Sequence, residues 1–141
     1  MHIRNKLQAY SLTALFSVII AVVGFSYNAW RLENTENNNN IRTAAFETFK
    51  ALAELEQIIY TLHYDHNTVE GSPRKAWVQV GLIHDLSGII STDVQDAAGI
   101  LQQLWQQHWA NVVTETASVE VIIKQIDVTR AAIKTTLLSL K

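Results

Sequence analysis

The longest uncharged stretch of this chain constrains its fold more than any other feature. No Asp, Glu, Lys or Arg occurs in residues 7–30, and the segment 12–25 (LTALFSVIIAVVGF) is almost wholly apolar. A helix of about 20 apolar residues is long enough to cross a bilayer. Aromatic residues, which favour the membrane interface, stand at both ends, with Tyr10 before the apolar segment and Tyr27 and Trp30 after it. The sequence therefore predicts a transmembrane anchor over residues 7–30.

A cleaved secretory signal is the alternative interpretation, because it also combines a short basic start with an apolar segment. Gly24 and Ser26 are small enough for a cleavage site, but the bulky Phe25 and Tyr27 crowd it. The apolar stretch is also longer than the apolar region of a typical signal. We therefore favour an uncleaved anchor.

The distribution of basic residues predicts the orientation of this anchor, because Lys and Arg near a membrane tend to stay in the cytoplasm. Arg4, Lys6 and the amino terminus precede the anchor, whereas only Arg31 follows it before Arg42. Residues 1–6 are then a cytoplasmic amino terminus, and everything after the anchor is exported. In a bacterium, the anchor lies in the inner membrane and the exported part is periplasmic.

Composition narrows the class of protein further. The chain has 141 residues, of which 48% are hydrophobic, with only five Gly and one Pro, which disfavours disorder and turn-rich β-sandwiches. The absence of Cys excludes disulfides, thiolate metal sites, a cysteine nucleophile and covalent c-type haem. A net charge of -2 without a basic cluster disfavours nucleic acid as a partner. Phosphate loops and nucleophile elbows are absent, and no acid/base pair is compelling, so we predict a protein that is not an enzyme and has no cofactor.

Downstream of the anchor, residues 31–40 (RLENTENNNN) are polar and rich in Asn, a poor helix former. We interpret them as a juxtamembrane linker or a weakened helix. Beyond them, apolar residues recur at alternating spacings of four and three, which places them on one side of a helix. This first stripe contains Ile41, Ala45, Thr48, Leu52, Leu55, Ile59 and Leu62, and it is widened by Phe46, Phe49, Ala53 and Tyr60.

Turn and cap signals predict three more helices. The turn formers of residues 65–72 end the first helix near Tyr64, and Pro73 suits the first turn of the next one. Thr92 and Gln95 form a capping box at the start of a third helix. The second helix is expected at about 74–90, the third from its cap at Thr92 to about 110, and the fourth from a break at 111–116 to residue 141.

Four amphipathic helices joined by short loops predict an up-and-down antiparallel four-helix bundle over residues 41–141. A β alternative fails because the apolar residues do not alternate with a period of two. The predicted fold class is therefore all-α, with an N-terminal transmembrane helix followed by this bundle.

Small residues form a seam along one side of the anchor. The seam contains Ala14, Ser17, Ala21, Gly24 and Asn28, spaced by three and four. Such seams let two membrane helices approach closely, although Ala, Ser and Gly are also common in membrane helices that do not associate. A seven-residue register is shared by Ser17, Gly24, Asn38 and Ala45. In a continuous helix, the seam would therefore lie on nearly the same side as part of the first stripe. We expect a homodimer, or a pairing with another membrane protein, through this seam.

The second predicted helix carries an unusual face composed of Trp77, Gly81, His84 and Gly88. Each Gly inside a helix costs about 1 kcal/mol relative to Ala, so two on one side require a reason. Close packing of a neighbouring helix is one reason, and a groove for a ligand or partner is the other. If Arg130 of the fourth helix faces a cavity, the N–H donors of its planar guanidinium group suit an anionic ligand.

The group His63, Asp65 and His66 is the one constellation that resembles metal ligands, because two imidazoles and a carboxylate can hold zinc with an open position. The alternative is that these histidines are favoured only by the negative end of a helix dipole.

The anchor followed by an exported helical bundle after the juncture SYNAW and NTENNNN resembles, in its layout, the four-helix sensory modules of bacterial chemoreceptors and sensor kinases. The resemblance covers the anchor and the bundle only, and no ligand motif of those receptors matches residue by residue. It implies an accessory or sensory-type module. We expect a single-pass membrane-anchored helical bundle that acts by protein association at the periplasmic face. The alternative is a periplasmic bundle that binds a small ligand or a metal.

Overall fold

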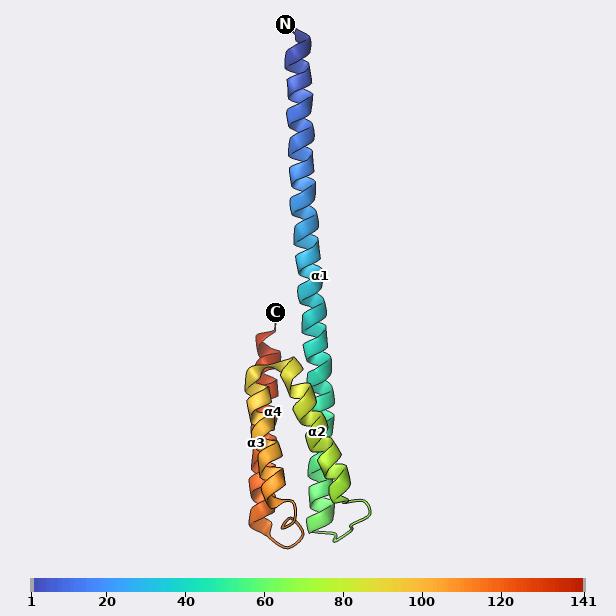
Figure 1. Ribbon diagram of the computed structural model, residues 1–141, viewed down its shortest axis with the longest axis vertical. Helices are drawn as coiled ribbons and strands as arrows, with labels where there is room; N and C mark the ends of the chain where they lie inside the picture. Colours follow the sequence, from blue (N-terminus) through green and yellow to red (C-terminus); the bar gives the residue numbers. More distant parts are fainter. Residues whose placement is uncertain (1, 141) are drawn as a thin grey trace. The chain divides into compact units, whose positions relative to one another are not determined.

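The computed structural model describes residues 2–140, and all of its regular structure is helical within that range (Figure 1). The predicted all-helical class is therefore confirmed, and no strand occurs among the residues described. The chain divides into two compact units, Met1–Asn37 and Asn38–Lys141. The helices are α1 (His2–His63), α2 (Pro73–Ile90), α3 (Thr92–His108) and α4 (Thr116–Ser139).

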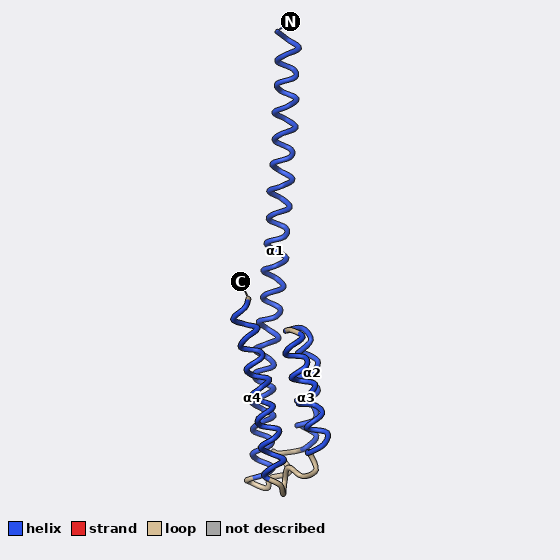
Figure 2. Tube along the Cα trace, turned by 90° about the vertical axis from the view of Figure 1, so that its left-hand side faces the viewer, coloured by secondary structure: helices blue, strands red, loops and turns tan. Residues whose placement is uncertain are grey.

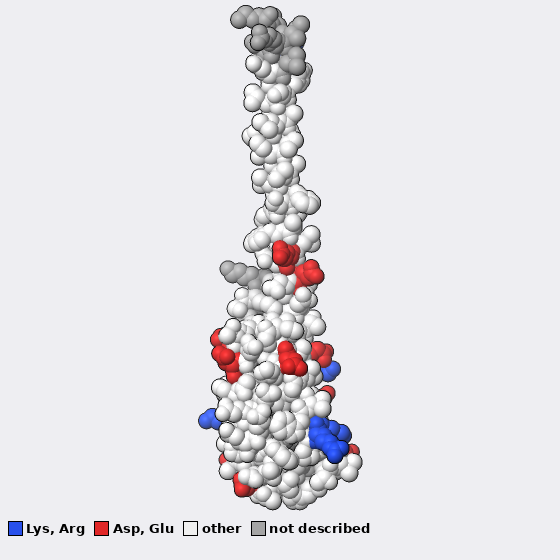
Figure 3. All heavy atoms as spheres, viewed as in Figure 1, with Lys and Arg blue, Asp and Glu red and all other residues white. Residues whose placement is uncertain are grey.

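The amino-terminal unit consists of the first part of α1. Its large apolar side chains are exposed all around the helix, from 51% for Ile19 to 77% for Phe25. On the face shown in Figure 3, this apolar stretch carries no charged atoms. By length and composition, α1 is the one described helix that is apolar enough to cross a membrane.

Residues 31–40 are helical (Figure 2). Of the two interpretations of this segment, a linker or a weakened helix, the structure therefore contains a helix. The hydroxyl groups of Thr35 and Thr43 donate to the carbonyl oxygens of Arg31 and Asn39, each at 2.9 Å. These bonds occupy the threonine hydroxyls within the helix, one turn back along the chain.

The carboxyl-terminal unit, Asn38–Lys141, contains the hydrophobic core. In it α2 packs against α3, and α3 packs against α4, beside the later part of α1 (Figures 1 and 2). The first stripe is buried as expected, with Ile41 only partly so. Phe46, Ala53 and Tyr60 do not widen it, because they lie on the solvent side of α1. The largest fully buried side chains include Leu52, Leu55, Ile59, Ile83, Leu101, Trp105, Ile122, Ile126 and Ile133.

Ser91 is the N-cap of α3, which corrects the expected capping box of Thr92 and Gln95. The backbone of Ser91 is extended (φ −171°, ψ 164°), and its hydroxyl accepts a hydrogen bond from the Val94 backbone N–H at 3.3 Å. Thr92 is already the first helical residue, so it cannot fill the cap position. The Ser91 hydroxyl also lies 3.0 Å from that of Thr136 on α4.

The loop between α1 and α2 folds tightly onto the last turns of α1. The side-chain oxygen of Asn67 accepts hydrogen bonds from the backbone N–H groups of Val69 and Glu70, at 3.0 and 3.2 Å. Gly71 is buried, and its N–H donates to the Asn67 carbonyl oxygen at 2.9 Å. A Cβ atom at Gly71 would stand 2.8 Å from both that oxygen and the Leu62 nitrogen. Only glycine fits at this close approach.

Candidate functional site

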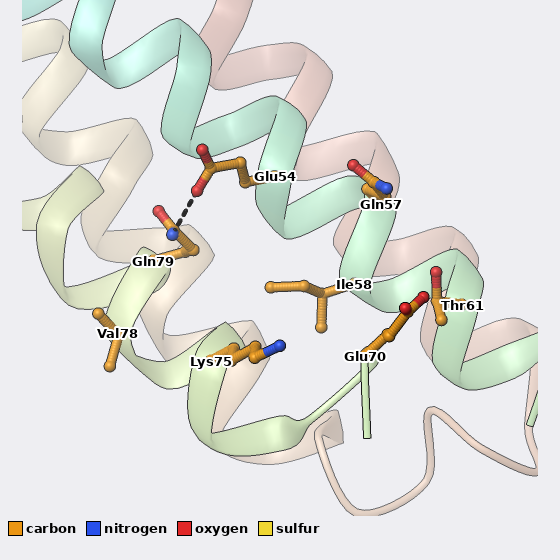
Figure 4. Close-up of a pocket in the computed structure, with 8 residues that line it drawn as sticks. All are labelled: Glu54, Gln57, Ile58, Thr61, Glu70, Lys75, Val78 and Gln79. Atoms are coloured by element: carbon orange, nitrogen blue, oxygen red, sulfur yellow. Dashed lines mark hydrogen bonds between the residues drawn. The ribbon is translucent and has the colours of Figure 1, made fainter. Parts of the chain in front are cut away.

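A cavity of about 510 Å³ opens between α1 and α2 in the carboxyl-terminal unit (Figure 4). Four lining residues come from α1, one from the preceding loop and three from α2. They are Glu54, Gln57, Ile58, Thr61, Glu70, Lys75, Val78 and Gln79. The sequence prediction did not include this cavity.

Charged groups of both signs enter this space. Figure 4 shows the Lys75 ammonium approaching from the first turn of α2, and the Glu70 carboxylate rising from the loop towards Thr61. Neither charge has an ion-pair partner among the residues described. Glu54 accepts a hydrogen bond at 2.6 Å from the side-chain nitrogen of Gln79, which is a neutral partner. Three charges therefore face the cavity without a salt bridge to neutralise them.

The local sequence explains how these side chains come together. Glu54, Ile58 and Thr61 are spaced by four and three, which puts them on one side of α1. Pro73 starts α2 and holds Lys75 in its first turn. The close approach at Gly71 holds the adjacent Glu70 against the end of α1.

A second polar cluster joins α1 to α4. Arg130 donates to the carboxylates of Glu56 and Asp127, the latter at 3.1 Å, and the Tyr60 hydroxyl donates to Glu56 at 3.3 Å. The side chains of Arg130 and Glu56 are only 23% and 24% exposed. Partial burial lowers the pKa of Arg130, but its bonds to Glu56 and Asp127 outweigh burial and raise it. Partial burial and the Glu56 carboxylate also raise the pKa of Tyr60. The arginine therefore serves this cluster as a fixed cation.

The residues singled out on the second helix lie along α2, on a side different from the cavity-lining Lys75 and Gln79. Trp77 is 37% exposed and meets the ring of Trp105 edge-on, with centroids 6.2 Å apart. The ring nitrogen Nδ1 of His84 is 3.8 Å from the carboxylate of the adjacent Asp85. Arg130 does not join this face, because it is bound to Glu56 and Asp127.

The two glycines of this face are not crowded by a neighbouring helix. A Cβ at Gly81 would meet nothing within 4 Å, and one at Gly88 would only touch the Gln95 side chain at 3.5 Å. We expect Gly81→Ala to raise the free energy of unfolding by about 0.5–1 kcal/mol, because Ala lowers the backbone entropy of the unfolded chain. Thermal unfolding monitored by circular dichroism should show a Tm higher by about 2–6 °C. A lower Tm would mean that a helix packs more closely on Gly81 than this structure shows.

Of the histidine group, His63 makes structural contacts with another part of the chain. Nδ1 of His63 lies 2.7 Å from the Val112 carbonyl oxygen, and Nε2 lies 3.4 Å from the Thr116 hydroxyl. His66 has a positive φ of 50° in the loop that follows Asp65. Among the side chains that the structure describes, no three from His, Asp or Glu gather closely enough to hold a metal ion. His63 instead ties the end of α1 to the segment between α3 and α4.

The seam of small residues lies on exposed helix in the amino-terminal unit. Ala14, Ser17, Ala21 and Asn28 are exposed, and nothing lies within 4 Å of a Cβ built on Gly24. The Ser17 hydroxyl donates to the Thr13 carbonyl oxygen at 2.9 Å. The seam therefore presents small groups to its surroundings, and its one hydroxyl is bonded within the helix.

Comparison with known proteins adds no constraint on this site. The chain matches no protein-family model, and no curated protein or solved structure is detectably similar to it.

Proposed function

We propose that this protein is a single-pass membrane-anchored bundle that acts by protein association at the periplasmic face of a bacterial inner membrane. In this proposal the first part of α1 spans the membrane, and residues 41–141 form an up-and-down antiparallel four-helix bundle outside it. The module is of an accessory or sensory type, and its partners are a second copy of the chain or another membrane protein.

The observation that carries the proposal is the apolar surface of the amino-terminal unit. Between residues 12 and 25, every Leu, Ile, Val and Phe side chain is at least half exposed, and no other element of that unit covers it. Removing one such side chain from water contributes about 1.5–3 kcal/mol. A helix that is apolar on all sides is typical of a membrane span, whereas a surface helix has a polar face.

The seam of small residues supports association of the span. Lipid provides no hydrophobic drive between membrane helices, so their association depends on close packing at small residues. Gly24 has open space around it, and Ala14 and Ala21 add little bulk on the same side.

Single cysteines test this function in intact cells, because the chain has no Cys of its own. We expect a membrane-impermeant maleimide to label Asn39→Cys from outside the inner membrane, since Asn39 is exposed and follows the span. We also expect Asn38→Cys, in register with Ser17 and Gly24, to form a disulfide-linked dimer. Adding Ala21→Leu and Gly24→Leu should remove most of this dimer, because larger side chains separate the helices.

The matched control is Val22→Leu, which enlarges a side chain off the seam and should leave the dimer unchanged. Labelling of Asn39→Cys only after lysis would contradict the orientation. A dimer that survives the seam substitutions would contradict association through the anchor.

A further inference from the structure

We propose that the cavity between α1 and α2 binds a small molecule with one carboxylate and two ammonium groups, the chemistry of a diamino monocarboxylic acid. This binding function goes beyond the association proposed above and does not depend on it.

The charges of the lining define this ligand class. Two carboxylates, Glu54 and Glu70, and one ammonium, Lys75, surround the space, which leaves a net charge of −1. A ligand with one carboxylate and two ammonium groups has a net charge of +1 and offers a partner of opposite sign to each side chain. A simple anion would meet two like charges, and a simple diamine would meet Lys75.

The three charged side chains are exposed at the rim of the cavity, and their charges are available for a ligand. Lys75 and Glu70 form no ion pair among the described residues, and Glu54 is bound only by the neutral Gln79 amide. Arg130 is the contrasting case, because Glu56 and Asp127 already use its donors. The lysine also stands in the first turn of α2, where the positive end of the helix dipole adds to the attraction for a carboxylate.

Apolar groups lie among these charges and fit a methylene chain. In Figure 4 the Ile58 side chain projects into the space between Glu54 and Lys75. Val78 is the other apolar lining residue, and it is 67% exposed. Pockets for small ligands combine apolar surface with placed polar groups, and here the polar groups form the larger part of the lining. The volume of about 510 Å³ is within the range of known small-ligand sites.

The test is isothermal titration of the full chain in detergent micelles with L-lysine and three matched analogues. Cadaverine lacks the carboxylate, 6-aminohexanoate lacks the α-ammonium, and norleucine lacks the side-chain ammonium. We expect L-lysine to bind saturably with a Kd of about 1 mM or tighter, and each analogue to bind about tenfold or more weakly.

Variants connect the binding to the cavity. Lys75→Met should weaken L-lysine binding by about tenfold or more and remove its preference over cadaverine, because the carboxylate loses its partner. Glu70→Gln should weaken L-lysine binding and leave it favoured over cadaverine. Lys134→Met, an exposed lysine of α4 outside the cavity, is the matched control and should bind like the parent chain.

Absence of saturable L-lysine binding would overturn the proposal. Equal binding of L-lysine and norleucine would overturn it too, as would equal affinities of Lys75→Met and Lys134→Met. None of these outcomes changes the labelling or cross-linking of the anchor, so failure here is distinguishable from failure of the proposed function.

Discussion

Gly71→Ala is expected to lower the free energy of unfolding of the carboxyl-terminal unit by about 1–3 kcal/mol, the cost of overpacking a tight site. The added methyl group would stand 2.8 Å from the Asn67 oxygen and the Leu62 nitrogen, both of which are backbone atoms. Backbone atoms cannot rotate away as a flexible side chain can. The loop must therefore shift, and the hydrogen bond from Gly71 to Asn67 is strained or lost. Thermal or denaturant unfolding monitored by tryptophan fluorescence measures the change.

Gly99→Ala provides the matched control, because a Cβ at Gly99 on α3 meets nothing within 4 Å. This variant should be slightly more stable than the parent chain, since Ala is the better helix former. Gly71→Ala should also displace the adjacent Glu70 and weaken L-lysine binding, whereas Gly99→Ala should not. Equal stability of the two alanine variants would mean that the loop accommodates the methyl group.

Arg130→Met is expected to lower the free energy of unfolding by about 1–3 kcal/mol, because charged hydrogen bonds are lost and a mostly buried carboxylate loses its cation. Glu56 is only 24% exposed, and the remaining bond from Tyr60 at 3.3 Å is long. Asp127→Asn should have a much smaller effect, because the Asp127 side chain is 66% exposed. Urea unfolding of the three chains measures these differences.

A double-mutant cycle with Glu56→Gln isolates the pair. The double variant should be more stable than the sum of the single effects implies, since it leaves no unpaired charge at the mostly buried position of Glu56 and only the exposed Asp127 without its arginine. Additive effects would mean that Arg130 and Glu56 contribute independently. The raised pKa of Arg130 gives the expected pH dependence: its contribution is present below its unfolded pKa and is lost only as pH rises through the folded value, far into the alkaline range.

Helix positions were predictable from the sequence because they depend on periodicity and on turn residues. The stripe from Ala45 to Leu62 is buried as its spacing indicates, and α2 starts at Pro73. The cap of α3 was misplaced by one residue, because Ser91 and Thr92 are both good caps and the backbone geometry decides between them. Phe46 was wrongly assigned to the core, since the spacing pattern does not show where the packed side of α1 ends.

The cavity residues could not be found by the same reasoning. In the sequence, Glu54 and Gln57 are typical of an ordinary solvated helix face. Lys75 is typical of a charged residue near the start of a helix. Their approach to one another depends on the loop of residues 64–72, whose path is set by Asn67 and Gly71. A single Gly in a turn is too common a signal to indicate such a close approach.

The edge-on contact of Trp77 with Trp105 gives the carboxyl-terminal unit an intrinsic signal in near-ultraviolet circular dichroism. Trp105 is fully buried, Trp77 is 37% exposed, and the two rings meet at 76° at the contact of α2 with α3. Trp77 belongs to the same helix as Lys75 and Gln79, which line the cavity. Near-ultraviolet dichroism of this pair therefore reports on the position of α2 without any added label.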